Sequence, residues 1–329
     1  MLIEVRDSSH AGEARRQADI FAEELGLGES ERGAMAIVIT EMVTNLVKHA
    51  RDGSIILSKF GNNGSQGVRV LSLDKGPGIR DLSAALEDGH STAGSMGSGL
   101  GAIRRMSHNF EIFSAESGTA ILSEFWRGGK QPKDDLPWRS ATVTLPYPGE
   151  KVIGDGWLAR KFANCVIFMV VDGLGHGLFA AEAAREAERI VSAITDATPS
   201  AILQDCHNAL KKTRGAAMGC AVIDLDKGVL HFGGIGNVAA SIAAPGSSRS
   251  LTSYNGTLGH QLHKIQEFSY PWNPDSILVM HSDGLNTRWH LDGYPGIWNK
   301  QPALIAGLLY RDHQRGRDDV TVLVAKNYA

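Results

Sequence analysis

Carboxylate side chains occur beside the ends of several predicted strands in the second half of the chain. Their positions are Asp155, Asp172, Asp283, Asp318 and Asp319. Strands that converge in a sandwich bring such ends together, and clustered carboxylates repel one another unless cations compensate their charge. All-oxygen ligation favours Mg²⁺ or Mn²⁺ over zinc. Two bridged ions would lower the pKa of a shared water and direct the resulting hydroxide at phosphorus.

The segment Asp172-Gly-Leu-Gly-His-Gly177 is the strongest local signal in this half. It follows a continuous apolar run over residues 165–171, which predicts a buried strand, and precedes an Ala-rich helix predicted over 178–194. The carbonyl of Gly173 is a candidate additional metal ligand. The alternative is an ordinary strand–turn–helix in which Asp172 caps the helix.

Three polar side chains in the same half are candidates for contact with a phosphorylated substrate. His176 can protonate a leaving serine oxygen, or it can hold its loop through a backbone hydrogen bond. Thr213 and Arg214 can contact a substrate phosphate through charge-assisted hydrogen bonds. Alternatively, Arg214 is a surface charge.

A polar ridge is expected on a helix predicted over residues 31–50. Glu41 and Asn45 are four residues apart and therefore project from the same side of the helix, and Lys48 extends that side. The amide oxygen of Asn45 suits a magnesium ion that also holds phosphate oxygens. The carboxylate of Glu41 can take a proton from an attacking hydroxyl. Alternatively, these side chains only solvate an exposed face.

Asp74 ends a predicted strand and is followed at once by a turn that contains Gly76 and Gly78. A buried carboxylate at this place can accept a hydrogen bond from an exocyclic amine such as that of adenine. The two glycines let the backbone come close to the ring. Turns commonly contain Asp, Pro and Gly, so the pattern is moderately specific.

A glycine cluster stands directly before another predicted helix, and its members are Gly97, Gly99, Leu100 and Gly101. The start of a helix presents unpaired amides to phosphate, and glycines permit a close approach. The cluster is neither a Walker loop nor a dinucleotide fingerprint, because no Gly-Lys-Ser/Thr follows and no strand immediately precedes it. Taken alone, it is also compatible with a simple loop.

The two sets of motifs are expected to lie in two separate domains. We expect residues 1–126 to form an α+β sandwich with helices on one face of a mixed sheet, and residues 139–329 to be richer in strands. Residues 127–138 are polar, contain Gly and Pro, and are expected to be the linker.

The expected elements follow from hydrophobic periodicity and turn residues. Helices are predicted over 12–25, 31–50, 178–194 and 302–311, with two more starting near 81 and 100. Strands are predicted over 2–5, 53–60, 67–73, 110–114, 119–125, 165–171, 219–225, 228–233, 238–243, 276–280 and 320–325.

Bulk properties limit the partners and the compartment. The net charge of −3 gives no electrostatic argument for nucleic acid or an anionic membrane. The beginning of the chain lacks the features of a secretory signal, and no apolar run approaches the ~20 residues that span a bilayer. Cys165, Cys206 and Cys220 are odd in number and far apart, so we expect reduced thiols. We therefore expect a cytoplasmic protein.

The ordered motifs from Glu41 to Thr119 resemble the GHKL (Bergerat) ATP-binding fold of gyrase, heat-shock protein 90 and histidine kinases. Residues 74–79, 85–92 and 110–112 are most similar to the serine/threonine switch kinases of bacterial partner-switching (stressosome) systems. The resemblance covers about residues 1–126. It implies that Glu41 is the catalytic base, Asn45 the magnesium ligand and Asp74 the adenine reader. It also implies a phosphate lid from Gly97 to Gly101 and a final adenine-pocket element at Thr119.

The second half resembles the metal-dependent type 2C protein phosphatases, in the branch of the sporulation stage II E phosphatase and the small stressosome phosphatases. The motifs that carry this resemblance are residues 172–177, 214–219, 234–237, 255–259, 281–284 and 317–321. The resemblance covers about residues 139–326 and implies an αββα sandwich. The metal ligands that it implies are Asp155, Asp172, Gly173, Asp283 and Asp318, with Asp319 the weaker candidate of its pair.

The sequence therefore predicts a fused switch kinase and phosphatase. ATP would phosphorylate a Ser or Thr of a small STAS-type anti-sigma-antagonist or stressosome scaffold protein, and a binuclear Mn²⁺ or Mg²⁺ centre would hydrolyse such phosphoserine or phosphothreonine. An anti-sigma factor or a second phosphatase is a further candidate partner. Two alternatives stay open: the first half is a nucleotide-gated binding module without kinase activity, or it regulates the attached phosphatase.

Overall fold

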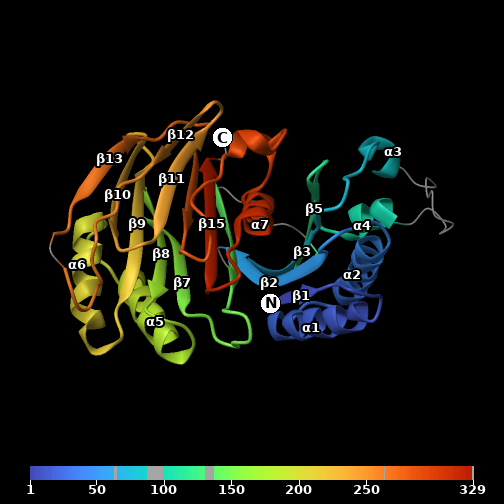
Figure 1. Cartoon of the computed structure of the whole chain (residues 1–329), viewed down its shortest axis with the longest axis horizontal. Coiled ribbons are helices and arrows are strands. Elements are labelled where there is room, and N and C mark those ends of the chain that lie inside the picture. Colours follow the sequence, from blue (N-terminus) through green and yellow to red (C-terminus); the bar gives the residue numbers. More distant parts are fainter. Residues whose placement is uncertain (63–64, 87–98, 130–136, 263, 328–329) are drawn as a thin grey trace. The chain divides into compact units, whose positions relative to one another are not determined.

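The computed structural model describes residues 1–62, 65–86, 99–129, 137–262 and 264–327. The chain divides into two compact units (Figure 1). Unit 1 consists of Met1–Asp135 together with Tyr294–Arg311, and unit 2 consists of Leu136–Gly293 and Asp312–Ala329. A segment from the second half of the sequence is therefore part of the first unit.

Unit 1 is a five-stranded sheet with helices. The strands are β1 (Leu2–Glu4), β2 (Ser54–Asn62), β3 (Ser65–Leu73), β4 (Asn109–Ala115) and β5 (Gly118–Trp126), in the order β1-β2-β3-β5-β4. The helices of its first segment are α1 (His10–Leu25), α2 (Glu29–His49), α3 (Leu82–Leu86) and α4 (Gly99–Met106). These elements confirm the predicted ones. The expectation of a mixed sheet is wrong, because each strand pairs with its neighbours antiparallel.

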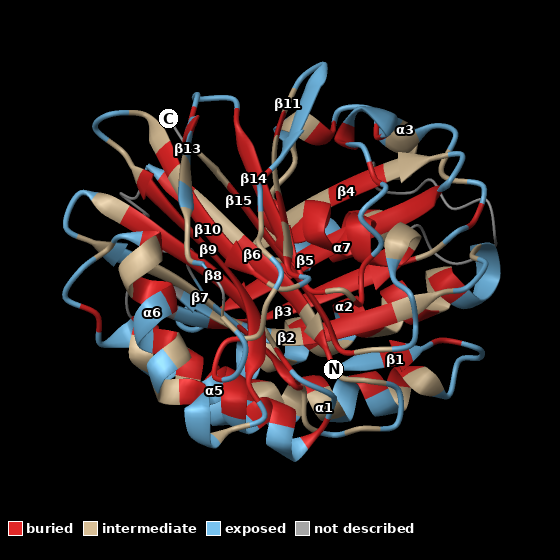
Figure 2. Cartoon of the chain, turned by 60° about the vertical axis from the view of Figure 1, so that its left-hand side comes forward, coloured by how far each residue is buried: buried red, intermediate tan, exposed pale blue. Residues whose placement is uncertain are grey.

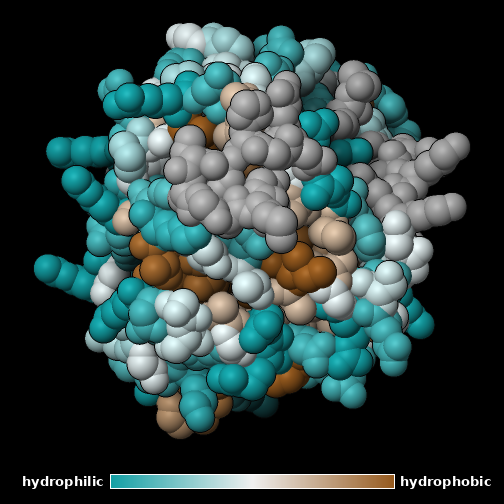
Figure 3. Space-filling model, turned by 90° about the vertical axis from the view of Figure 1, so that its right-hand side faces the viewer, coloured by the Kyte–Doolittle hydropathy of each residue, from teal (hydrophilic) through white to brown (hydrophobic). Residues whose placement is uncertain are grey.

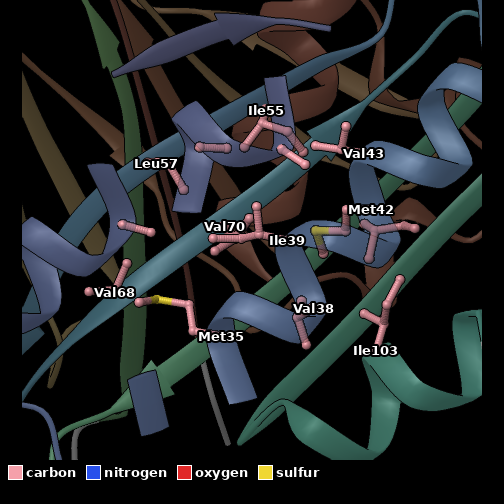
Figure 4. Packing of buried hydrophobic residues seen from close by; sticks show 14 of the residues in the cluster. Met35, Val38, Ile39, Met42, Val43, Ile55, Leu57, Val68, Val70 and Ile103 are labelled. Atoms are coloured by element: carbon pink, nitrogen blue, oxygen red, sulfur yellow. The ribbon is translucent and has the colours of Figure 1, made fainter. Parts of the chain in front are cut away.

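The core of unit 1 lies between α2 and the sheet (Figure 4). The apolar side chains of α2 recur with helical spacing and face the strands. Its buried members are Met35, Val38, Ile39, Met42, Val43 and Leu46. Strand residues such as Leu57 and Val70 and the α4 residue Ile103 meet them. This packing leaves the ridge of Glu41 and Asn45 outside the core.

Val47 has the helical spacing of the buried apolar residues of α2, but it is 42% exposed and is not one of them. Ile37 on the same helix and Met106 of α4 are also exposed. Figure 3, which looks at the side of unit 1 that carries α2 and α4, shows hydrophobic surface among hydrophilic surface. Scattered exposed apolar side chains are normal on protein surfaces.

Unit 2 contains two five-stranded sheets. One has the order β13-β10-β9-β8-β7, and the other has the order β12-β11-β14-β15-β6. The strands are β6 (Trp138–Leu145), β7 (Asp155–Phe162), β8 (Cys165–Gly173), β9 (Ala216–Asp224), β10 (Val229–Ile235), β11 (Ala239–Ala244), β12 (Ser247–Ser250), β13 (Glu267–Pro271), β14 (Ile277–His281) and β15 (Val320–Asn327). The helices are α5 (Leu178–Ser192) and α6 (Pro199–Ala209).

Two apolar layers hold unit 2 together. In the first, Phe168 of β8 meets Leu278 of β14 and Leu323 of β15, so the two sheets pack face to face. In the second, the opposite face of the β8–β9 sheet packs on α5 and α6. Because β8 is covered on both faces, it is apolar throughout residues 166–171, as its sequence predicts (Figure 2).

Several elements of unit 2 are absent from the prediction, namely β6, β7, β12, β13 and α6. β12 is exposed at each position, and β13 and β7 are largely uncovered on one side, so they lack a continuous apolar run. The helix α7 (Pro302–His313) was expected, and its residues from Pro302 to Arg311 are buried. Through the described part of the chain, no helix combines the length and apolarity needed to cross a membrane.

Gly118 provides a test of how closely the backbone must pack in unit 1. Its φ is +125°, and a Cβ placed on it would lie 2.0 Å from the carbonyl oxygen of Asp74. We expect Gly118→Ala to destabilise unit 1 by about 2–3 kcal/mol, because strain and a clash combine. Hydrogen exchange of the β3 and β5 amides measures the change.

The control is Gly33→Ala in α2, where nothing stands within 4 Å of the added methyl group. This exchange should stabilise unit 1 by about 0.5–1 kcal/mol, since an exposed helical glycine is replaced by alanine. Equal protection of β3 and β5 in both variants would contradict the account.

Candidate nucleotide pocket and metal centre

The polar ridge of α2 stands beside the start of α4. Glu41 and Asn45 are half-buried and Lys48 is exposed, one helical turn apart from one another along α2. A Cβ on Gly99 would lie 3.8 Å from Oδ1 of Asn45, so the first residue of α4 approaches the predicted magnesium ligand. The structure thus brings Asn45 together with Gly99, Leu100 and Gly101 of the glycine cluster. Gly97 lies outside the described residues.

Asp74 is held by backbone amides from two segments. Its Oδ1 accepts hydrogen bonds from the amide of Gly76 at 2.7 Å and from the amide of Thr119 at 3.2 Å. The amide of Asp74 in turn donates to the carbonyl of Thr119 at 3.0 Å. Asp74 and Gly76 therefore form one wall of the predicted nucleotide site together with Thr119, which lies far from them in sequence.

Glycines allow the segments of this wall to touch. Gly78 has φ +71°, and a Cβ on it would lie 2.2 Å from the carbonyl oxygen of Ala115. The sequence analysis missed Ser114, whose hydroxyl accepts a hydrogen bond from the Ile79 amide at 2.7 Å. The same hydroxyl lies 3.2 Å from that of Thr119. Nothing in the local sequence marks this serine, since it follows an ordinary strand pattern.

Burial raises the pKa of Asp74 above its ordinary value, while the amides of Gly76 and Thr119 act in the opposite direction. The carboxyl is partly removed from water and already oriented. Such a group suits recognition of an exocyclic amine at a fixed place. The arrangement fits the predicted adenine site.

In unit 2, five carboxylates meet near the ends of β7, β8, β14 and β15. Asp155 and Asp172 are paired residues across β7 and β8. The charges of Asp155, Asp283, Asp318 and Asp319 all act on Asp172. The carboxylates of the predicted metal set therefore lie close together, although they come from distant parts of the sequence.

Electrostatics in this cluster oppose ionisation. Burial and then the neighbouring carboxylates raise the pKa of Asp172 far above its usual range. Burial, followed by the charges of Asp319 and Asp318, also raises the pKa of Asp155. A bound divalent cation would compensate the negative charge of such a cluster.

One atom of the cluster has no protein partner. Asp155 is 5% exposed, and its Oδ2 accepts a hydrogen bond from the hydroxyl of Ser282 at 2.6 Å. Its Oδ1 is buried and makes no hydrogen bond. A buried carboxylate oxygen without a donor is costly, and a cation would satisfy it. The donor set therefore fits a hard divalent metal.

The cluster is not a closed cage. Considering the described residues only, no three His, Cys, Asp or Glu side chains stand close enough to enclose an ion. Gly173 is fixed at the site, because a Cβ there would lie 2.2 Å from the carbonyl oxygen of Ala180.

The remaining carboxylates differ in how they are held. Both oxygens of Asp319 accept backbone amides, from Tyr147 at 2.7 Å and from Gly154 at 3.0 Å. Asp283 accepts a hydrogen bond from the side-chain amide of Asn237 at 2.6 Å. Asp319 thus fixes the loop before Asp155. Asp318 accepts a hydrogen bond from the amide of Asp319 at 2.9 Å.

Ser282 and Asn237 were not singled out in the sequence analysis as site residues. Ser282 precedes Asp283 directly and joins Asp155 to the amide of Thr321, which donates to the serine hydroxyl at 2.9 Å. Asn237 sits in a Gly-rich segment that carried the family resemblance. Both lie within motifs that carry the phosphatase resemblance, residues 234–237 and 281–284, and this is the signal that could have identified them.

His176 and Arg214 stand on the loops beside the cluster. His176 Nδ1 lies 2.9 Å from Glu150 Oε1, and its ring stacks on Tyr147 at 4.6 Å between centroids. The side-chain partner of His176 in this loop is therefore a carboxylate. The Arg214 guanidinium lies over the ring of Phe179, 4.8 Å from its centroid.

Two family models match the chain. The model described as stage II sporulation protein E (SpoIIE) matches residues 163–328. The model described as a histidine kinase-like ATPase domain matches residues 5–123. The two matches fall on the two halves that carry the metal cluster and the nucleotide pocket.

Relatives of each half are known separately. Serine/threonine-protein kinase RsbT of Bacillus subtilis (strain 168) is 33% identical over 114 residues, which cover 34% of this chain and 86% of RsbT. Phosphoserine phosphatase RsbX of the same strain is 26% identical over 151 residues, which cover 45% of this chain and 76% of RsbX. A crystal structure of RsbX in complex with magnesium shares the fold with TM-score 0.51 and 22% identity, covering 60% of this chain and 99% of that one.

The predicted order of a GHKL-type ATP-binding domain followed by a type 2C phosphatase fold is thereby confirmed. The kinase-like half and the phosphatase half of partner-switching systems occur here in one polypeptide. The chain belongs to the stage II sporulation protein E family and carries its type 2C serine/threonine phosphatase domain behind an RsbT-like, histidine kinase-like ATPase domain.

Proposed function

We propose that the two domains add and remove phosphate on serine or threonine residues of small STAS-type anti-sigma-antagonist or stressosome scaffold proteins in the bacterial cytoplasm. One observation carries this proposal: a single chain contains both an Asp74 carboxyl held by backbone amides and a cluster of carboxylates in which Asp155 Oδ1 is buried without a hydrogen bond. An anti-sigma factor or a second phosphatase is a further partner of the same pathway. Nucleic acid and membranes are not among the proposed partners.

In the ATP domain, the proposed roles follow the positions on α2 and α4. Asp74 reads adenine, and Gly76, Gly78 and Thr119 shape the wall behind it. Asn45 holds magnesium, Lys48 approaches phosphate, and Gly97 to Gly101 close over the nucleotide. Glu41 accepts the proton of the substrate hydroxyl, one turn from Asn45 on the same helix.

In the phosphatase domain, Asp155, Asp172, the Gly173 carbonyl, Asp283 and Asp318 would hold two Mg²⁺ or Mn²⁺ ions. The ions would supply charge neutralisation and a water of lowered pKa. The protein's own contribution is to fix these oxygens in advance.

Three neighbours provide this fixation. Ser282 orients Asp155, Asn237 orients Asp283, and Asp319 ties the Asp155 loop to the Tyr147 and Gly154 amides. Asp319 therefore acts as a positioning residue more than as a ligand.

For the kinase activity, Glu41→Ala is expected to retain ATP binding and to lose phosphate transfer by about 100-fold or more, because the proton acceptor is removed. Incubation with labelled ATP and a STAS-domain protein measures transfer. Addition of Mn²⁺ should then release the label in the unaltered protein.

Glu29→Ala at the exposed start of α2 is the matched control and should transfer label normally. Equal labelling by Glu41→Ala would remove Glu41 as the base. Absence of labelling in the unaltered chain, with ATP still bound, would favour a binding module.

For the metal centre, Mn²⁺ at about 100 times its Kd should stabilise unit 2 by about 2.7 kcal/mol. Asp172→Asn should abolish this gain and lower turnover of p-nitrophenyl phosphate by about 100-fold or more while ATP binding is kept. Asp275→Asn, an exposed carboxylate outside the cluster, should behave as the unaltered protein. Normal turnover in Asp172→Asn would contradict the metal assignment.

A second candidate function is regulation of the phosphatase by nucleotide, and the position of Tyr294–Arg311 in unit 1 favours it. This segment is bound by polar contacts to β4. The side-chain amides of Asn109 and Gln301 hydrogen-bond to each other in both directions, at 2.9 and 3.1 Å. The backbone amide of Gln301 donates to the carboxylate of Glu111 at 2.8 Å.

The same segment reaches the nucleotide wall. Nη1 of Arg311 donates to the carbonyl of Asp74 at 3.1 Å. Gly307 of α7 lies against β3, since a Cβ there would be in ordinary contact with Leu71 and Leu73 at 3.4 Å. Beyond Arg311 the chain continues directly to the loop of Asp318. Nucleotide at Asp74 can thus bias the loop that carries a metal ligand.

We expect a non-hydrolysable ATP analogue to change hydrolysis of p-nitrophenyl phosphate several-fold, the scale of ordinary allosteric coupling. The pair Asn109→Ala with Gln301→Ala should reduce this response without removing nucleotide binding. Gln204→Ala on α6 is the control. Identical rates with and without the analogue would rule out regulation and leave two independent enzymes.

A further inference from the structure

We propose that Leu174, Leu178, Phe179 and Arg214 form a docking surface for the apolar residues that flank a phosphoserine in the protein substrate. We call this set the docking surface. The proposal rests on the phosphatase function proposed above and adds a recognition element to it. The occupant is a phosphoserine segment with large apolar neighbours.

The apolar members are exposed to an unusual degree and lie together in sequence. Leu178 is 69% exposed, Phe179 is 61% exposed and Leu174 is 44% exposed. One exposed leucine needs no explanation, but three large exposed apolar side chains fall within the short stretch of loop and first helical turn that follows Asp172-Gly173. The stretch begins at the residue next to a proposed metal ligand.

The fold does not need these side chains for its own packing. α5 faces the core through small residues, namely Ala180, Ala181, Ala183, Ala184 and Ala187. Leu178 and Phe179 occupy the first turn of this helix on the side away from that face. Their apolar character therefore points to a function outside the domain.

Arg214 adds a cation at the same place. Its guanidinium covers Phe179 at 4.8 Å, and its Nη1 lies 3.1 Å from the position of a Cβ on Gly175. The loop that holds it is tied to the metal loop, because the Leu174 amide donates to the Gly215 carbonyl at 3.0 Å. A guanidinium at this site suits the dianionic phosphate of phosphoserine.

Position and charge together select the occupant. A phosphoserine that reaches Asp172 and Gly173 must place its neighbouring residues over the adjoining Leu174 and over the start of α5. Apolar neighbours would remove the three exposed side chains from water, while Arg214 meets the phosphate. A second copy of this chain would use the same apolar surface but has no need of the cation.

Two synthetic phosphoserine nonapeptides test the proposal, one with Leu and Phe beside the phosphoserine and one with Ser at those places. The unaltered full chain with Mn²⁺ should show about tenfold higher kcat/KM for the apolar peptide. Leu178→Ala with Phe179→Ala should lose this preference through KM, while turnover of p-nitrophenyl phosphate stays unchanged. Arg214→Gln should raise KM for both peptides.

The control is Ile20→Ala, which removes an exposed apolar side chain (46%) from α1 and should keep the preference. No preference in the unaltered protein, or an unchanged preference in the double variant, would overturn the proposal. A dimer that becomes a monomer in the double variant, seen by sedimentation, would assign the surface to self-association instead. If the unaltered protein with Mn²⁺ does not hydrolyse p-nitrophenyl phosphate at all, this result refutes the phosphatase function rather than the docking surface.

Discussion

Repulsion among clustered carboxylates is the constraint on which unit 2 depends. Asp155 and Asp172 face each other across paired strands, and burial and neighbouring charge raise the pKa of both. Because these folded-state pKa values exceed the unfolded ones, ionisation opposes folding as pH rises above about 4. The proposed cations would offset this cost, and Ser282, Asn237 and two backbone amides keep the carboxylates oriented.

In unit 1, a single carboxylate is held by backbone amides, with the charge of Arg311 nearby. Asp74 receives backbone amides from Gly76 and Thr119. The segments can meet only because Gly78 and Gly118 adopt positive φ and carry no Cβ. In unit 1, glycines allow the backbone segments around Asp74 to approach each other. In unit 2, polar neighbours orient the carboxylates. In both units, backbone amides replace the water that burial removes.

The sequence predicted two kinds of feature: helices and strands with a regular hydrophobic pattern, and polar residues at the ends of such elements. The stripe of α2 and the apolar run of β8 identified two cores, and Asp74 and Asp172 were found because they end strands. Features without a periodic signal were missed: β7 is open on one side, and Ser114 looks like any strand residue. The position of Tyr294–Arg311 in unit 1 could not be predicted, because it depends on contacts such as Asn109 with Gln301 across distant sequence.

The central claim is that the acidic cluster of unit 2 is a site for two divalent cations. Crystals grown with Mn²⁺ test it most directly, through anomalous scattering at the manganese edge. The account predicts two peaks among the oxygens of Asp155, Asp172, Gly173, Asp283 and Asp318, with Asp155 Oδ1 directed at one of them. Fully ordered carboxylates with no peak between them would contradict it.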